Sequence, residues 1–388
     1  MRQLTVLRSA HLGFSLVEMM IAMTIGLMIA AGLVTIFANT SNTQQELRRS
    51  SQQIENGRYA MDVLSQDLQV TGYFGSYRKL TTPAAAADPC SVVLVDLQGA
   101  ISLPVQAYNA ASITAQPTLP TGCDTLLPLA NLSPGSDVLV VRRSDTQIVP
   151  IGTTTPSGQV YAQANPSTIA LQPGGGTTTC LSTANGTEDP TVVITRRIQY
   201  PTSTDICPTT AAPAGYLRQH HVHIYFVAPC NVPASGSTCG TDADGGRPIP
   251  TLKRAELTTD GTNPVFQTVA IAEGVEFMKV GYGVDDTPTA VNPDTGRIGD
   301  GSPDRYVLAP TLAELTNIVT ARVDLLVRNP EPSASFTDSK TYALGVDPVT
   351  PTSPALSIAP TSLDRTYRRH VYNAEIRLVN LSSRKEIP

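Results

Sequence analysis

The apolar residues of this chain form one long block near its start and short alternating runs later. Residues 19–38 carry no formal charge, and a charge-free stretch of that length can span a bilayer as a helix. Beyond the block, apolar side chains recur at intervals of three, four and seven, which predicts one buried face of a helix: Leu47, Ile54, Met61, Leu64 and Leu68. Because no proline occurs before Pro83, residues 14–70 can form a single helix, and Gly72 and Gly75 are expected to end it.

After Thr82 the pattern changes to short β-like runs separated by loops rich in proline, glycine and threonine. Six runs predict strands: 137–142, 192–198, 222–227, 275–282, 318–328 and 371–379. In the fifth run, valine, alanine and leucine alternate with polar residues, which predicts a half-buried strand. The pattern therefore indicates an α+β protein, in which a long N-terminal helix packs on a β-rich globular head.

The cysteine count adds disulfides to this picture. All six cysteines follow the apolar block: Cys90, Cys123, Cys180, Cys207, Cys230 and Cys239. An even number fits disulfides formed in an oxidising compartment. Six cysteines allow fifteen pairings. Closeness in the sequence favours three disulfides, Cys90 with Cys123, Cys180 with Cys207, and Cys230 with Cys239. The formal net charge is -5, so no overall basic surface for nucleic acid is expected.

A single acid, Glu18, stands at the start of the apolar block, in the segment GFSLVEMM of residues 13–20. A carboxylate in a membrane helix costs roughly 2.5 to 3.5 kcal/mol, so such an acid usually has a partner. This segment resembles the signal of type IV prepilins, which implies cleavage after Gly13, and that cut would create an α-amino cation at Phe14, one helical turn from Glu18. A pair of these groups in a helix bundle of low dielectric would let many such helices pack side by side.

Two plainer interpretations of this segment remain. A secretory signal peptide would also have a basic start and an apolar core, but its cleavage site would follow the core, and residues 37–39 make a poor one. A simple single-span anchor would carry Glu18 by accident.

Residues 13–20 resemble the class III signal of type IV prepilins and pseudopilins. The resemblance implies that a prepilin peptidase cuts after Gly13 and methylates Phe14, and that Glu18 becomes the fifth residue of the mature chain. It also implies three parts of the chain: a leader of residues 1–13, a helix of residues 14–72 with a transmembrane segment at about 16–38, and a head of residues 73–388. The helix is expected in the inner membrane, with the head in the periplasm.

Later segments resemble the PilW-type minor pilins of the same superfamily: residues 55–64, 66–75, 135–142, 275–276, 282–285, 304–306, 322–328 and 368–372. This resemblance implies a minor pilin that joins other minor pilins at the pilus tip, primes polymerisation of the major pilin and helps to display a large tip adhesin at the cell surface. A J-type pseudopilin of a type II secretion system shares the same plan and is the alternative.

An enzyme is not indicated, because the chain has no nucleophile elbow, phosphate loop or His-Glu-x-x-His motif. On a strand, His221 and His223 would share a face and could bind a metal with a third ligand, although a solvent-facing position is the expectation. The acidic loop 285–304 has the oxygen ligands that calcium prefers, but three of its residues, Pro288, Pro293 and Arg297, dilute the pattern. We therefore expect no metal, no cofactor and no catalytic residue.

Overall fold

The computed structural model describes residues 15–77, 83, 85–150, 153–164, 169–177, 217–234, 236, 238–286, 299–333, 336–347 and 353–384. The strand expected at 192–198 lies outside these ranges. The chain divides into two compact units, residues 1–51 and residues 52–388.

Helix α1 runs without a break from Leu16 to Val70, which confirms the single long helix that the absence of proline predicts. In the first unit its apolar side chains are exposed, and by length and composition it is a helix that could cross a membrane. After Val70 the backbone of Gly72 has a φ of 74°. This left-handed conformation favours glycine, so the helix ends where the sequence places its stop.

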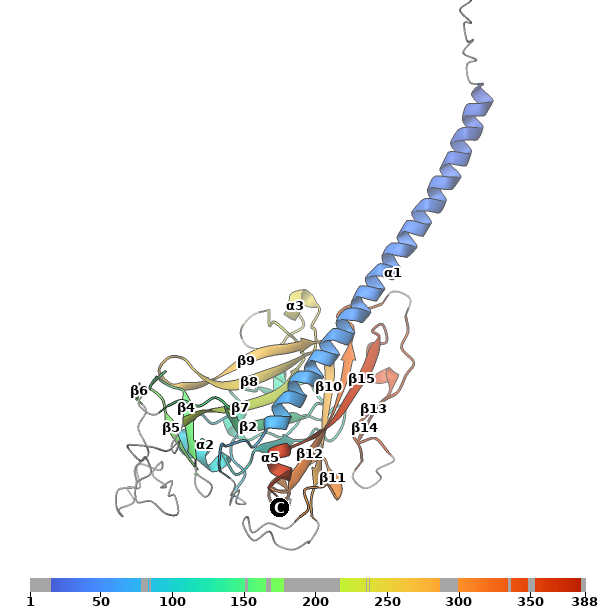
Figure 1. Ribbon diagram of the computed structural model, residues 1–388. Coiled ribbons are helices and arrows are strands. Elements are labelled where there is room, and N and C mark those ends of the chain that lie inside the picture. The colour runs from blue at the N-terminus through green and yellow to red at the C-terminus, as the bar shows by residue number, and fades with distance from the viewer. Residues whose placement is uncertain are drawn as a thin grey trace, which may run out of the picture. The chain divides into compact units, whose positions relative to one another are not determined.

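The larger sheet of the second unit has seven antiparallel strands: β1 (Val105–Tyr108), β2 (Val138–Ser144), β4 (Val160–Ala164), β5 (Ile169–Pro173), β7 (Leu217–Ala228), β8 (Thr251–Thr259) and β9 (Pro264–Glu273). The long strand β7 lies in the middle (Figure 1), pairing with β2 on one side and with β4 and β8 on the other. Only β2 and β7 of these strands were predicted. The others are short, or mix polar and apolar residues, so the spacing of apolar residues does not mark them as strands.

The second sheet has the order β11-β10-β12-β15 and is also antiparallel. Its strands are β10 (Val275–Val284), β11 (Arg305–Val307), β12 (Ile318–Arg328) and β15 (Arg369–Arg377). Two small pairs complete the strands, β3 (Thr154–Thr155) with β6 (Gly176–Thr177) and β13 (Tyr342–Leu344) with β14 (Leu356–Ile358). Short helices connect them: α2 (Leu94–Ala100), α3 (Ala243–Gly246), α4 (Leu312–Leu315) and α5 (Val379–Ser382).

Strand β12 is buried on both faces, so the expectation of a half-buried strand was wrong. Ala321, Val323 and Leu325 face the main core as predicted. On the other face, Leu326 packs in a second apolar cluster with residues of β13 and β14. The small β13–β14 pair therefore covers a face that the sequence pattern assigned to solvent.

The C-terminal part of α1 packs on the sheets through a buried stripe that mixes polar, small and large apolar residues: Gln53, Gly57, Ala60, Leu64, Asp67 and Leu68. The predicted apolar stripe is correct at Leu64 and Leu68 but wrong at Leu47 and Ile54, which are 64% and 41% exposed. Nearer the N-terminal end of this stripe, α1 contacts the head through Gln53, whose Nε2 donates to the carbonyl oxygen of Val327 at 2.7 Å. Gly57 lies so close to β15 that a Cβ atom there would overlap the ring of Tyr372.

Gly57→Ala is expected to lower the free energy of unfolding of the full chain by about 1 to 3 kcal/mol, because the added methyl group overpacks the contact with Tyr372. Gly99→Ala is the matched control, since a Cβ at Gly99 of α2 meets no atom within 4 Å. Alanine should stabilise that helix by up to about 1 kcal/mol. Urea unfolding in detergent, followed by circular dichroism, measures both; equal effects would contradict the close packing of α1 on β15.

Candidate functional site

Glu18 lies in the first turn of α1 and is exposed. Its Oε2 accepts a hydrogen bond from the backbone nitrogen of Ser15 at 3.0 Å. The carboxylate therefore turns back toward the start of the helix, where unpaired backbone N–H groups favour a negative charge. Gly13 and Phe14, the other two residues of the expected processing site, lie outside the described residues.

Two of the three expected cysteine pairs are disulfides in the structure. Cys90 and Cys123 are joined across 33 positions, and Cys230 and Cys239 across 9. Their Cα atoms are 5.1 and 5.6 Å apart, ordinary distances for a disulfide. Cys180 and Cys207 lie in a part of the chain that the structure does not describe. The two bonds fix loops whose residues supply little regular secondary structure.

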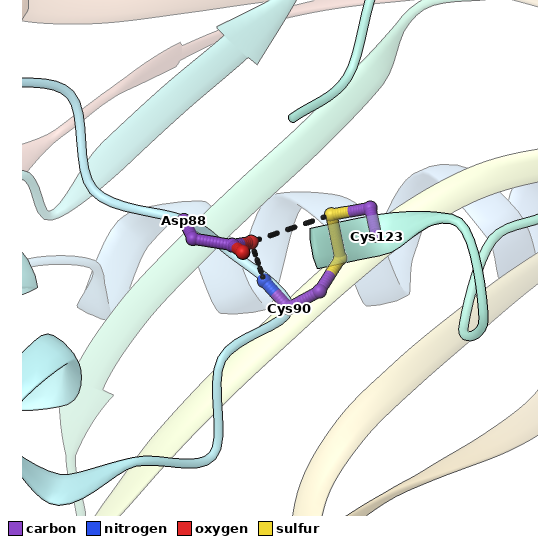
Figure 2. A group of neighbouring side chains, drawn as sticks. All are labelled: Asp88, Cys90 and Cys123. Carbon is purple, nitrogen blue, oxygen red and sulfur yellow. Dashed lines mark hydrogen bonds between the residues drawn. A yellow bond between two sulfur atoms is a disulfide. The ribbon is translucent and has the colours of Figure 1, made fainter. Parts of the chain in front are cut away.

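Asp88 lies beside the first of these disulfides (Figure 2). Its Oδ1 accepts a hydrogen bond from the backbone nitrogen of Cys90 at 2.9 Å and lies 3.6 Å from the Sγ of Cys123. In the described part of the chain, these three side chains form the one group of three or more acidic, cysteine or histidine side chains close enough to share a metal ion. Both sulfurs are consumed by the disulfide, however, and a metal needs thiolates. The group is therefore a disulfide with a neighbouring carboxylate, and its donors do not suit a metal.

The histidines of β7 lie on both faces of the strand. His221 and His223 share one face, as predicted, with ring centroids 5.8 Å apart. They do not face open solvent, since His223 is only 5% exposed and its Nδ1 lies 2.5 Å from Oδ2 of Asp67. His220 is buried on the opposite face next to Phe74. Burial, together with the charges of His221 and Arg142, lowers the pKa of His220 to about 3, so its ring is neutral at physiological pH.

Asp67 joins α1 to the larger sheet through a buried ionic network. Its carboxylate contacts His223 and accepts hydrogen bonds from the hydroxyl of Tyr225 at 3.0 Å and from Nε of Arg143 at 2.9 Å. Burial alone would raise the pKa of Asp67, but the hydrogen bonds and charges of His223 and Arg143 outweigh it and hold the pKa well below its usual range. The network extends to Arg254, whose Nη1 lies 3.5 Å from the Tyr225 hydroxyl.

The position of Asp67 in the sequence indicates this network, although the spacing of apolar residues alone does not. Asp67 stands three positions after Leu64 and next to Leu68, so it belongs to the buried face of α1. An acid on such a face requires a partner. His223 and Arg143 could not be assigned to it from the sequence, because they lie 156 and 76 positions away.

The acidic loop uses its described carboxylates for internal contacts. Asp285 is buried and accepts a hydrogen bond from the backbone nitrogen of Gly301 at 2.7 Å. Asp304 accepts one from the backbone nitrogen of Asp286, also at 2.7 Å. The carboxylate of Asp286 pairs with Arg305 at 2.5 Å. Residues 287–298 lie outside the described ranges, and the described acids of this loop do not form a cluster of three close metal ligands.

Two family models match the chain. The model described as "Type IV Pilus-assembly protein W" matches residues 238–380, and the "Prokaryotic N-terminal methylation motif" matches residues 8–34. The first match contains the whole of the second sheet with β8, β9, β13 and β14, and the second contains Glu18 and the start of the apolar block. No curated protein and no solved structure matches the chain. The segments 55–75 and 135–142 lie outside both family matches.

Asp67→Asn should lower the free energy of unfolding by about 3 kcal/mol at pH 7, because it leaves Arg143 without its buried counter-charge and removes the carboxylate that His223 contacts. The folded-state pKa of Asp67 is depressed, so its stabilisation is present above the unfolded-state pKa and is lost as the pH falls. The difference between wild type and variant is therefore expected to shrink below about pH 4.

Urea unfolding over a series of pH values measures this difference. Asp62→Asn is the matched control, since Asp62 lies on the same helix but is exposed, and it should change the free energy of unfolding by less than about 0.5 kcal/mol. Equal effects of the two substitutions at neutral pH would show that the network does not hold the helix.

Proposed function

We propose that this chain, a type IV pilin of the PilW type, is a minor pilin that primes pilus polymerisation within a complex at the pilus tip. The matches to a pilus-assembly family and to the N-terminal methylation motif support this role. The proposed role is structural and requires no catalysis. Its partners would be a prepilin peptidase, other minor pilins, the major pilin and a large tip adhesin.

The single observation that carries the proposal is the position of Glu18 in a helix that is otherwise apolar for more than five turns. The residues that follow it, 19–38, have no charge, and those with large apolar side chains are exposed. An exposed apolar helix of this length is stable in a bilayer, but the acid within it is costly. Its carboxylate reaches back to Ser15, the residue next to the expected new N-terminus.

The mechanism we propose begins with cleavage after Gly13 and methylation of the new amine at Phe14. The mature chain would then stay in the inner membrane through residues of about 16–38, with its head in the periplasm. The amine of Phe14 would pair with Glu18 of its own or a neighbouring subunit. In a medium of low dielectric such a pair is much stronger than in water, and it would align the helices of neighbouring subunits before they leave the membrane.

The head fits an environment outside the cytoplasm. Its disulfides stabilise loops by about 2 to 4 kcal/mol each, and such bonds persist in the periplasm and at the cell surface. Extraction from the membrane would bring the heads of neighbouring subunits into lateral contact, while the helices form the bundle beneath them.

Processing is the first test. Gly13→Val should leave full-length precursor in the inner membrane, because a side chain at this position would block the peptidase. Gly26→Val is the matched control, since a Cβ at Gly26 meets no atom within 4 Å, and it should be cleaved like wild type. Mass spectrometry of the wild-type protein should find an N-methylated Phe14. An N-terminus at Met1 or at Asn39 would contradict the proposal.

Assembly is the second test, and it rests on Glu18. Glu18→Ala removes a costly charge, so membrane insertion and cleavage should persist. Pilus number should nevertheless fall, because the Phe14 amine of a neighbouring subunit loses its partner, at a cost of about 3 to 5 kcal/mol. Glu46→Ala is the control, since this acid lies beyond the apolar block and forms an ion pair with Arg49, at 3.6 Å, in the same helix.

The measurement is pilus number by electron microscopy in strains with a single mutant copy, with immunoblots to confirm processing and amount. Normal piliation together with a specific loss of secreted proteins would assign the chain to the J-type pseudopilins instead. Normal results in both assays would leave Glu18 without a role in assembly.

A further inference from the structure

Arg142 on β2 is a buried cation with an unused hydrogen-bonding edge. The residue is 1% exposed, and its Nη1 donates to the carbonyl oxygen of Leu103 at 2.8 Å. Its Nε and Nη2 are buried and have no hydrogen-bond partner among the described residues. These two nitrogens form the planar fork that receives a carboxylate or another oxyanion in bidentate pairs. The structure therefore presents an edge suited to an anion.

Other buried cations of the head show what is missing at Arg142. Nζ of Lys279 lies 2.6 Å from Asp137, and Nε of Arg369 lies 2.6 Å from Glu276. Arg142 forms no ion pair with any residue that the structure describes. Burial lowers its pKa to about 10, so the guanidinium is still charged at neutral pH. A buried charge without a partner is costly, and buried charges are normally paired.

The nearest acidic and neutral groups inside the protein do not contact the free edge of Arg142. The carboxylate of Asp88 accepts a hydrogen bond from the backbone nitrogen of Cys90 and lies against the disulfide (Figure 2), and although its charge raises the pKa of Arg142, no ion pair joins the two among the described residues. Tyr108 is neutral, because burial raises its pKa to about 12. His220 is neutral as well. Nε and Nη2 of Arg142 are thus left without a contacting partner among the described residues.

Neighbouring polar groups place further hydrogen-bond donors on this face of the sheet. Ser144 follows Arg142 on the same face of β2, and His220 lies opposite Ser144 on β7. The Ser144 hydroxyl and both ring nitrogens of His220 are buried, and in the part of the chain that the structure describes they have no hydrogen-bond partner. A hydroxyl and a neutral imidazole can each donate one hydrogen bond, which adds to the donors of Arg142.

We infer that Arg142 holds a small inorganic anion of the size of chloride in the interior of the head. The complete burial of its side chain favours a small ion over an organic ligand, and such an ion would enter as the head folds. The anion would act on the stability of the head, independently of the role of Glu18 in assembly. It would supply the negative charge that aspartate and glutamate supply to Lys279 and Arg369.

The test is the melting temperature of the full chain in detergent at pH 7, measured by circular dichroism while sodium chloride replaces sodium gluconate at constant ionic strength. A ligand of the native state stabilises it by mass action, so the melting temperature of wild type should rise by about 3 °C or more and then saturate. Arg142→Met should abolish the rise. Arg247→Met, at an exposed arginine, should keep it. A wild type without a chloride response would overturn the inference.

A second measurement does not depend on any variant. Crystals of the full wild-type chain soaked in bromide should show an anomalous peak within hydrogen-bond distance of Nε and Nη2 of Arg142. An ordered water molecule there, without an anomalous peak, would overturn the inference.

Discussion

The packing of α1 on the head depends on the contacts that the carboxylate of Asp67 makes with Arg143, His223 and Tyr225. This carboxylate fixes the last turns of α1 to β2 and β7 of the larger sheet, while Gln53 and Gly57, higher on the same helix, contact β12 and β15 of the second sheet. One helix thus touches both sheets. Breaking a buried pair by removing one partner costs about 3 to 5 kcal/mol, a large share of the stability of a typical domain.

The two halves of α1 meet opposite physical demands with different residues. The first half is apolar on all sides and carries Glu18 as its one acid before Glu46, which suits a medium that is apolar on all sides. The second half is amphipathic, and small residues such as Gly57 and Ala60 let it approach the sheets closely. Both halves belong to one continuous helix, Leu16–Val70.

The sequence predicted what local patterns determine. The long helix, the α+β class and strands such as β12 follow from proline placement and apolar spacing. The prediction that Leu47 and Ile54 lie on the buried face of α1 was wrong. The spacing of apolar residues takes no account of glycine, yet the close approach at Gly57 decides which face of the helix meets the sheet. The burial of His223 and the second covered face of β12 could not be predicted, since both depend on segments far away in the chain. Glu18 stands out in the sequence because a lone acid in an apolar block conflicts with its surroundings, and its role in assembly stays a prediction.

The central claim is that the chain is a component of the assembled pilus and not only an anchored membrane protein. Quantitative mass spectrometry of sheared, purified pili measures this directly. The account predicts that the chain is present in the pili, in small amount relative to the major pilin, and begins with N-methylated Phe14. Pili of normal composition that lack the chain, with all of it retained in the inner membrane, would contradict the account.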